Sequence, residues 1–483
     1  MIRILESDIH IANTRARMPF RYGIASMTVM PQVFVRVHLT VDGRKSWGIA
    51  ADCLPPKWFT KDPASDYRDD VADMLSVIRA ASTHLQQAGE GESVFDLWQQ
   101  TYIAQMGWGT KANHRPLLWN FGVTLVERAM IDAFCRATDT TFARALHDNA
   151  LGMHLRELHH ELADARPADL LPGKPLDRII ARHTVGLSDP LTDDDIASEA
   201  RVDDGLPQAL DACIGAYGLT HFKIKIGGDA EGDLERLRRI AHVLDTCIPG
   251  GNYAYTLDGN EQYRSVGDFA AFWQSLAGCD ALSAFRKRLL FVEQPLHRDV
   301  ALSAATGDDM LDWDDRPATI IDESDCMITS LPEALDLGYV GTSYKSCKGV
   351  FKGIANACLI AQRRRQNPNG RYIISGEDLC NIGPVALLQD LAVVASLGIT
   401  HVERNGHHYF KGLAMFPNAV QQQVLDHHGD LYHRHAQGFV ALNVQDGGVA
   451  VGSVTGAPLG VAFNLDVSLF TPVDDWKFDS LNA

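Results

Sequence analysis

Two lysines separated by a single residue are the most informative chemical feature of this chain. Lys223 and Lys225 alternate with Phe222, Ile224 and Ile226, and this period of two predicts a strand with both ammonium groups on one face. Neighbouring cations lower each other's pKa, and a metal ion close by would favour a value of about 7–8, at which a lysine acts as a base near neutral pH. Solvated strand faces can carry the same pattern, so the chemistry depends on the residues that follow.

Carboxylates end three later apolar runs. Asp258, Glu293 and Asp322 each close one such run, and Glu323 follows Asp322 directly. Their spacing of roughly 30–35 residues suits one strand, one helix and two loops in a β/α barrel of eight units and ~250 residues. The carboxyl ends of successive parallel strands converge at one end of such a barrel. An oxygen-only ligand set suits a hard cation, so we expect Mg²⁺, with Mn²⁺ as its substitute.

A fourth strand-like run, residues 341–344, precedes Lys345 and Lys348 and completes an ordered set of motifs. Residues 258–260 read Asp-Gly-Asn, 291–295 end in Glu-Gln-Pro, and 322–324 read Asp-Glu-Ser. The set resembles the enolase superfamily, in the branch that includes mandelate racemase and the muconate lactonizing enzymes. Each motif alone is weak evidence, but their order, with Lys-X-Lys upstream and a lysine downstream, is specific.

The resemblance implies a two-part architecture for most of the chain. A modified TIM barrel of the (β/α)7β type would span residues 178–418, and an α+β capping domain would be formed by residues 1–150. The C-terminal segment, residues 419–483, would pack back on the cap. The periodicity of the sequence fits this division, because strands at 32–41 and 46–50 and helices at 71–88 and 117–136 precede the first expected barrel strand at 179–185.

The resemblance also implies roles for individual residues. Lys225 and Lys345 would be acid/base catalysts on opposite faces of the substrate, and Lys223 would be the electrostatic neighbour of Lys225. The remaining groups would bind the metal or stand close to it: the ligands Asp258, Glu293 and Asp322, and the neighbouring or alternative groups Asn260, Glu323 and Lys348. Glu323 is the alternative to Asp322 as third ligand. Lys348 is the alternative to Lys345 as acid/base catalyst, because residues 347–353 replace the small Gly-Gly step that usually follows this lysine in the family.

Two loops of the cap are expected to cover the barrel mouth and to set substrate specificity. Their residues suggest a distal anionic or aromatic substrate group, although aromatic packing between cap and barrel would explain the aromatic residues equally well. The predicted substrate-binding residues are Phe20, Arg21, Tyr22, Lys57 and Trp58.

Several features depart from the family pattern. The excess length falls in residues 151–175, 188–204, 265–288 and 301–315. Residues 403–405 replace the paired aspartates of dipeptide epimerases, which disfavours a dipeptide substrate. His407 and His408 lie beyond the eighth strand rather than at the end of the seventh, so they do not replace the second lysine as in mandelate racemase. They are expected in a polar loop, with a substrate contact as the alternative.

Composition excludes several classes of protein. A formal net charge of −17 argues against a nucleic-acid partner, and the apolar runs are shorter than the ~20 residues of a membrane helix. The nine scattered cysteines are typical of reduced thiols packed as small apolar groups. We therefore expect a cytoplasmic protein, a homo-oligomer, with a small-molecule carboxylate as substrate.

Three functional hypotheses follow. The first is a Mg²⁺-dependent racemase or epimerase that removes the proton α to a carboxylate through a metal-stabilised enediolate. The second is a cycloisomerase or a syn-eliminating lyase of the same family, in which one lysine only stabilises charge. The third, of a different class, is a catalytically inactive barrel with a binding or structural role.

Overall fold

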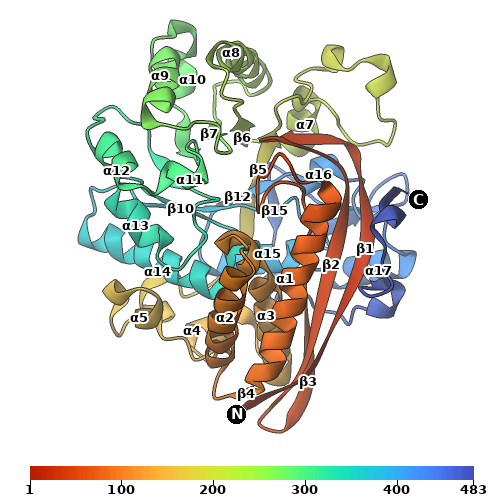
Figure 1. Cartoon of the computed structure of the whole chain (residues 1–483). Helices are drawn as coiled ribbons and strands as arrows, with labels where there is room; N and C mark the ends of the chain where they lie inside the picture. The colour runs from red at the N-terminus through yellow and green to blue at the C-terminus, as the bar shows by residue number, and fades with distance from the viewer. Residues whose placement is uncertain (483) are drawn as a thin grey trace.

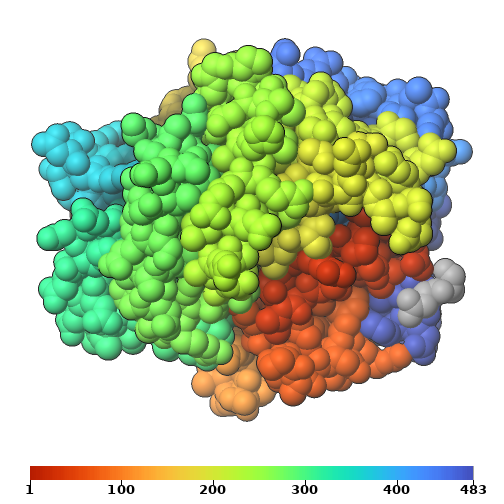
Figure 2. Space-filling model, turned by 90° about the horizontal axis from the view of Figure 1, so that it is seen from above, coloured from red at the N-terminus to blue at the C-terminus, as the bar shows by residue number. Residues whose placement is uncertain are grey.

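The computed structural model describes residues 1–482 and divides into a cap and a barrel that share one continuous apolar core. Figure 1 places the N-terminal strands and helices along one side of the barrel. Figure 2, seen from above, places the same N-terminal elements directly against the first half of the barrel. The described residues contain no helix that is both long and apolar enough to cross a bilayer.

The cap consists of an antiparallel sheet packed against three long helices. Its strands are β1 (Ile2–Tyr22), β2 (Ala25–Val41) and β3 (Arg44–Cys53), and the short β4 (Glu90–Gly91) pairs with β1. Its helices are α1 (Tyr67–Ala88), α2 (Val94–Lys111) and α3 (Pro116–Ala137). Capping boxes begin α1 at Asp66 and α2 at Ser93, where each side-chain oxygen satisfies a free backbone N–H. The sequence had predicted β2, β3, α1 and α3 but not α2.

The second domain is a closed barrel of eight parallel strands, in which the last strand pairs with the first. The strands are β5 (Arg178–Val185), β6 (His221–Lys225), β7 (Ala254–Asp258), β8 (Leu289–Glu293), β9 (Thr319–Ile321), β10 (Gly341–Tyr344), β11 (Ile373–Gly376) and β12 (His401–Arg404). This arrangement confirms the predicted barrel. Because Asp258 and Glu293 end their strands and Asp322 and Lys345 directly follow theirs, all four lie at the same end.

Helices outside the barrel follow each of the first seven strands. They are α7 (Leu210–Tyr217), α8 (Ala230–Cys247), α9 (Val266–Ala277) with α10 (Ser283–Arg286), α11 (Arg298–Ala301) with α12 (Ala304–Leu311), α13 (Ser330–Asp336), α14 (Val350–Gln366) and α15 (Ala386–Ser396). After β12 the chain forms only the short α16 (Gly406–Tyr409) before α17 (Asn418–His427).

Connecting segments tie the cap to the barrel. The link between the domains carries α4 (Phe142–His147), α5 (Leu155–Leu158) and α6 (Pro167–Leu170). The excess segment 188–204 also reaches the cap, because Arg17 of β1 donates from Nε to Asp204 Oδ2 at 2.6 Å and from Nη2 to Asp204 Oδ1 at 2.8 Å.

The C-terminal segment contributes to both domains. It forms β13 (Tyr432–Arg434), β14 (Val440–Leu442), β15 (Gly448–Ala450), α18 (Gly452–Thr455) and β16 (Thr471–Pro472). β15 pairs antiparallel with β5 on the barrel, whereas β16 pairs antiparallel with β1 of the cap. Trp476 Nε1 donates to Asn13 Oδ1 at 2.8 Å and fastens the chain end to the cap.

Close packing of α1 against α3 gives the first testable prediction. A Cβ added at Gly122 of α3 would overlap the Val77 carbonyl of α1. We expect Gly122→Ala to lower the free energy of unfolding by about 3 kcal/mol, because overpacking a rigid contact forces backbone shifts. Gly107→Ala is the matched control, since Gly107 is exposed on α2 with open space around it, and there alanine should be neutral or stabilising by up to ~1 kcal/mol. Urea unfolding measures both, and equal midpoints would contradict the prediction.

Candidate active site

A buried lysine lies among four carboxylates at the centre of the barrel mouth. Lys223 Nζ lies 3.0 Å from Asp258 Oδ2, 2.9 Å from both oxygens of Glu293, 2.5 Å from Glu377 Oε2 and 2.9 Å from Glu403 Oε2. Burial by itself would lower the pKa of Lys223, but the four carboxylates outweigh burial and hold that pKa well above its usual value. The four carboxylates therefore favour the charged form of Lys223.

The second lysine of β6 faces the space between barrel and cap. Lys225 Nζ donates to Asp258 Oδ2 at 2.5 Å, and its side chain lines a cavity shared with cap residues. Lys223 and Lys225 point to the same side of the strand, as the period of two requires.

Lys345 approaches the same cavity from the opposite side of the barrel. It directly follows β10, which is four strands away from β6 in the closed sheet of eight. Lys345 Nζ donates to Asp322 Oδ2 at 2.6 Å and lies 4.8 Å from the centre of the Trp58 ring, a cation–π contact. Burial would lower the pKa of Lys345, yet Asp322 holds it well above the usual value.

Lys348 is held away from this cavity by its own contacts. Its Nζ donates to Asp322 Oδ1 at 3.2 Å, to Ser343 Oγ at 2.9 Å and to the Asp322 carbonyl at 3.2 Å. Asp325 Oδ2 lies 3.5 Å away. Of the two competing lysines, Lys345 is the one that lines the cavity.

The three carboxylates predicted as metal ligands end consecutive strands and are fully buried. For Asp258, Lys223 and Lys225 outweigh burial and lower the pKa, and for Asp322, Lys345 and Lys348 outweigh burial and hold the pKa well below its usual value. For Glu293, burial dominates, reinforced by the neighbouring carboxylates, and its pKa is raised well above the usual value.

Unsatisfied oxygens beside these strand ends fit a divalent cation. Glu323 Oε2 and Asn260 Oδ1 are buried without a hydrogen-bond partner, and Glu293 Oε2 contacts Lys223 without an aligned hydrogen bond. Asn260 Nδ2 donates to Glu323 Oε1 at 3.3 Å, while burial and the Asp322 charge raise the pKa of Glu323 to about 7. An oxygen-only donor set with spare lone pairs is the chemistry that Mg²⁺ selects.

The carboxylates themselves are spread more widely than ligands of one ion. Within residues 1–482, the trio of His, Cys, Asp or Glu whose ligand atoms all lie within 4.8 Å of one another is His183, Cys213 and His408, at a different place. The donor types at the barrel mouth therefore suit a cation, but its binding would draw Asp258, Glu293 and Asp322 together, away from their lysine partners.

Polar residues on β5, β11 and β12 complete the inner wall, and sequence reasoning assigned them no role. Arg182 contacts Glu377 and donates to Ser375 Oγ at 2.9 Å, and Thr184 Oγ1 donates to Glu403 Oε1 at 2.8 Å. Glu377 and Glu403 lie at the ends of the seventh and eighth strands. The strand-end rule that identified Asp258 and Glu293 applies to them equally, so the signal was available.

The cap closes tightly over the mouth. The cavity between cap and barrel measures ≈ 30 Å³, about the space of one water molecule. Phe20 stacks on Tyr409 at 4.1 Å between ring centres, and Tyr22 Oη donates to the Pro56 carbonyl at 2.8 Å. A molecule larger than water therefore needs the cap loops to move apart before it can enter. The cavity is lined by Phe20, Tyr22, Met27, Pro55, Trp58, Lys225, Asn260, Lys345, Asp378, Leu379, Cys380, Glu403 and Asn405.

Two of the predicted substrate-binding residues point elsewhere. Arg21 is exposed, because alternation along β1 turns it away from the side that buries Phe20 and Tyr22. Lys57 donates from Nζ to Ser65 Oγ at 2.6 Å and lies 3.6 Å from Asp70 Oδ2. The structure brings Phe20, Tyr22 and Trp58 to the cavity and leaves both cap cations outside it.

His407 and His408 are buried rather than placed in a solvated loop. Their exposed fractions are 8% and 2%, so the expected polar loop is corrected. They lie behind β5, against His183, and line no part of the cavity around Lys225 and Lys345, within the residues that the structure describes.

Comparison with solved structures supports the fold. An N-succinyl Arg/Lys racemase from Bacillus cereus is 15% identical with a TM-score of 0.56, covering 94% of this chain and 98% of that one. A mandelate racemase/muconate lactonizing protein from Herpetosiphon aurantiacus is 17% identical with a TM-score of 0.57, covering 96% and 99%. A dipeptide epimerase from Enterococcus faecalis, complexed with Mg and a dipeptide, is 14% identical with a TM-score of 0.58, covering 95% and 99%.

Sequence comparison gives no further identification, since no family model and no curated protein matches this chain. At these low identities the structural likeness establishes the fold, a capped barrel that extends over nearly the whole chain. The fold implied by the resemblance of the motifs is thereby confirmed.

The ion cluster around Lys223 gives the second prediction. We expect Lys223→Met to lower the free energy of unfolding by about 3–5 kcal/mol, because its removal leaves buried carboxylates without their shared cation. Lys225→Met is the control, since Lys225 contacts one carboxylate, Asp258, at the edge of the cavity. Urea unfolding at pH 7 measures both variants, and equal losses would contradict a central role for Lys223.

Proposed function

We propose that this chain belongs to the mandelate racemase/muconate lactonizing branch of the enolase superfamily and removes the proton α to a substrate carboxylate. One observation carries the proposal: Lys225 and Lys345 come from opposite strands of the barrel and line one cavity. The ends of β7, β8 and β9, which lie between these strands, carry the three predicted ligand carboxylates.

A bound divalent cation, Mg²⁺ or its substitute Mn²⁺, would supply positive charge to the substrate carboxylate. The residues that would hold it are Asp258, Glu293 and Asp322, with Glu323 as the alternative third ligand and Asn260 close by. A dipeptide epimerase of similar fold is complexed with Mg, which supports a divalent cation in this fold. Lys223 contributes a fixed charge beside Asp258 and Glu293.

Racemisation or epimerisation suits the two lysines best. Nζ of one lysine removes the α-proton, and Nζ of the other delivers a proton to the opposite face of the same carbon. Phe20, Tyr22 and Trp58 would exclude water and orient the rest of the substrate, because they form the apolar roof of the cavity. Lys345 beneath the Trp58 ring would be oriented by the cation–π contact.

A cycloisomerase or a syn-eliminating lyase is the second candidate within the family. Such an enzyme needs one lysine as acid or base and uses the other only to stabilise charge. The mandelate racemase/muconate lactonizing protein among the structural neighbours is compatible with either chemistry. A catalytically inactive barrel is the candidate of another class. The two lysines that line one cavity, each held by a buried carboxylate, weigh against it.

The substrate we propose is a small carboxylic acid with an apolar or aromatic distal group. The cavity roof is aromatic, and the cap cations Arg21 and Lys57 point away from it, so the distal anionic group suggested by the sequence loses its support. The homo-oligomeric state and the cytoplasmic location expected from the sequence stay predictions.

Solvent exchange tests the proposal without knowledge of the substrate. The protein is incubated in D₂O with Mg²⁺ and a library of chiral carboxylic acids. We expect deuterium to replace the α-proton of the substrate acid, and mass spectrometry or NMR detects the exchange. Lys225→Ala and Lys345→Ala should each slow the exchange about 10²–10⁴-fold from one enantiomer, because each removes one acid/base group. Lys174→Ala is the control, because Lys174 is exposed before the start of β5 and does not line the cavity. It should leave the rate unchanged.

The outcomes separate the candidates. If each lysine variant loses exchange from one enantiomer and keeps exchange from the other, the result indicates a racemase or epimerase. If exchange occurs from a single enantiomer and only one variant abolishes it, the result indicates the cycloisomerase or lyase. Absence of exchange with every acid, together with absence of Mg²⁺ binding in calorimetry, would contradict the enzyme and favour the inactive barrel. Exchange that persists in the double lysine variant would contradict the assigned catalysts.

A further inference from the structure

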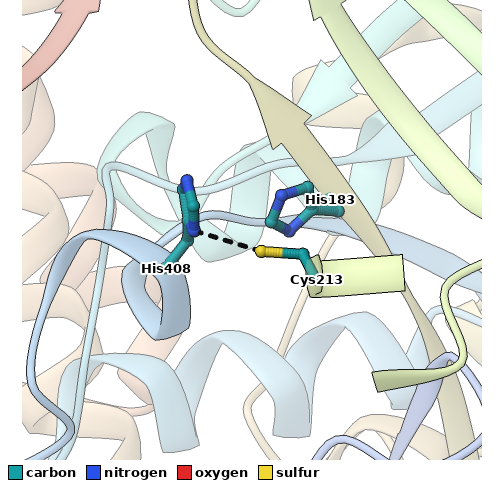
Figure 3. Close-up of side chains that lie close together, drawn as sticks. All are labelled: His183, Cys213 and His408. Carbon is teal, nitrogen blue, oxygen red and sulfur yellow. Dashed lines mark hydrogen bonds between the residues drawn. The ribbon is translucent and has the colours of Figure 1, made fainter. Parts of the chain in front are cut away.

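A second cluster of chemically reactive side chains lies outside the barrel mouth. Figure 3 shows His183, Cys213 and His408 converging from three elements: β5, α7 and α16. Arg182 and Thr184 of β5 contact the inner carboxylates Glu377 and Glu403, so His183 between them points to the outer side of the barrel. The cluster is thus separated from the lysines and carboxylates of the mouth by the barrel wall.

The three side chains form a compact and dry group. Cys213 is fully buried, and His183 and His408 are each 2% exposed. One ligand atom from each residue lies within 4.8 Å of the other two. Buried imidazole nitrogens need a hydrogen-bond or metal partner, and a thiol beside them can share in either.

The measured spacing suits ligands of one tetrahedral ion. Zn²⁺ binds Cys sulfur at ≈ 2.3 Å and His nitrogen at ≈ 2.0–2.1 Å, which places sulfur and nitrogen about 3.6 Å apart at a tetrahedral angle. Cys213 Sγ and His408 Nδ1 are 3.6 Å apart. An S–H···N hydrogen bond can have the same length, so the spacing permits an ion, and metal analysis must distinguish the two.

Neighbouring groups orient the cluster as outer partners of metal ligands do. Asp189 Oδ2 lies 3.8 Å from His408 Nε2 and accepts from Tyr409 Oη at 2.5 Å. His407 Nε2 lies 3.2 Å from His183 Nδ1. His407 also lines a cavity of ≈ 170 Å³ with Tyr217 of α7 and Gly406 of α16, so this cavity lies next to the cluster.

We propose that His183, Cys213 and His408 bind one Zn²⁺ ion at a site that is distinct from the Mg²⁺ site of the barrel mouth. On binding, the Cys213 sulfur forms a bond to the ion, and its proton passes to solvent. Nitrogen and sulfur ligands select Zn²⁺, whereas the all-oxygen set of the mouth selects Mg²⁺. The two ions would therefore not exchange sites.

The site would anchor the segment after β12 to the barrel and to the cap. The His408 carbonyl accepts from Arg17 Nη1 of β1 at 3.1 Å, and the adjacent Tyr409 stacks on Phe20. Asn405 and Glu403, just upstream, line the catalytic cavity. An ion held by His408 would thus stiffen a segment that contacts both the cap and the proposed catalytic residues.

Metal analysis of the full chain, expressed without a polyhistidine tag, tests the proposal. We expect about one equivalent of zinc per chain in the purified protein. After removal of zinc, titration with Co²⁺ should give a thiolate-to-cobalt charge-transfer band that excess Mg²⁺ does not abolish. Cys213→Ala should lose the band and weaken binding more than 100-fold, and Asp189→Asn should weaken it about 10-fold, as expected for an outer partner.

Cys358→Ala is the matched control, because Cys358 is equally buried but lies on α14, away from the cluster. It should keep the zinc and the band, and added Zn²⁺ should raise the Tm of this variant and of the wild type but not that of Cys213→Ala. A folded wild type that carries no zinc and gives no charge-transfer band would overturn the proposal. A band of equal strength in Cys213→Ala would also overturn it, since the ion would then bind elsewhere.

Discussion

The sharing of one ammonium group among four carboxylates is the constraint on which the barrel mouth depends. Parallel strands bring their carboxyl ends together, so a sequence that places acids at those ends concentrates negative charge in a dry space. Without a cation these acids would repel or take up protons. Lys223 Nζ lies within 3.0 Å of carboxylates from β7, β8 and β12 and of Glu377 beside β11, and it thereby lets the mouth keep its charge while the barrel stays closed.

The same geometry places the two lysines of the proposed mechanism on opposite sides of one cavity. In a closed sheet of eight, strands four apart lie across the barrel from each other, and β6 and β10 have this relation. The fold, rather than any local feature, places Lys225 and Lys345 opposite each other. Each is held by a different carboxylate, Asp258 or Asp322, so the two groups can be tuned independently.

The features that could be predicted from the sequence are those that repeat along the chain. The alternation at Lys223 and Lys225 and the acids that close apolar runs predicted the barrel, its open end and the lysine pair. The same alternation places Arg21 opposite Phe20 and Tyr22, whereas the predicted substrate contact of Arg21 depended only on its charge. Helix α2 was missed because its apolar face is interrupted by Gln, Thr and Gly residues between Trp98 and Lys111.

The group of His183, Cys213 and His408 was beyond sequence reasoning for a different reason. Metal motifs are recognised when their ligands are a few residues apart. His183 and Cys213 come instead from β5 and α7 of the first β/α unit, and His408 follows the last barrel strand, so the three meet only because β5 pairs with β12.

That pairing also explains how the outer cluster and the mouth can be coupled. β12 and the residues after it carry Glu403 on the inner side and His408 on the outer side, and β5 carries Thr184 and His183 in the same way. Because each of the two chain segments has one side chain in the mouth and one in the cluster, a shift of either segment changes both places at once. The cap contacts the segment after β12 through Arg17 and Phe20, so an opening of the cap would act on a segment that carries residues of both places.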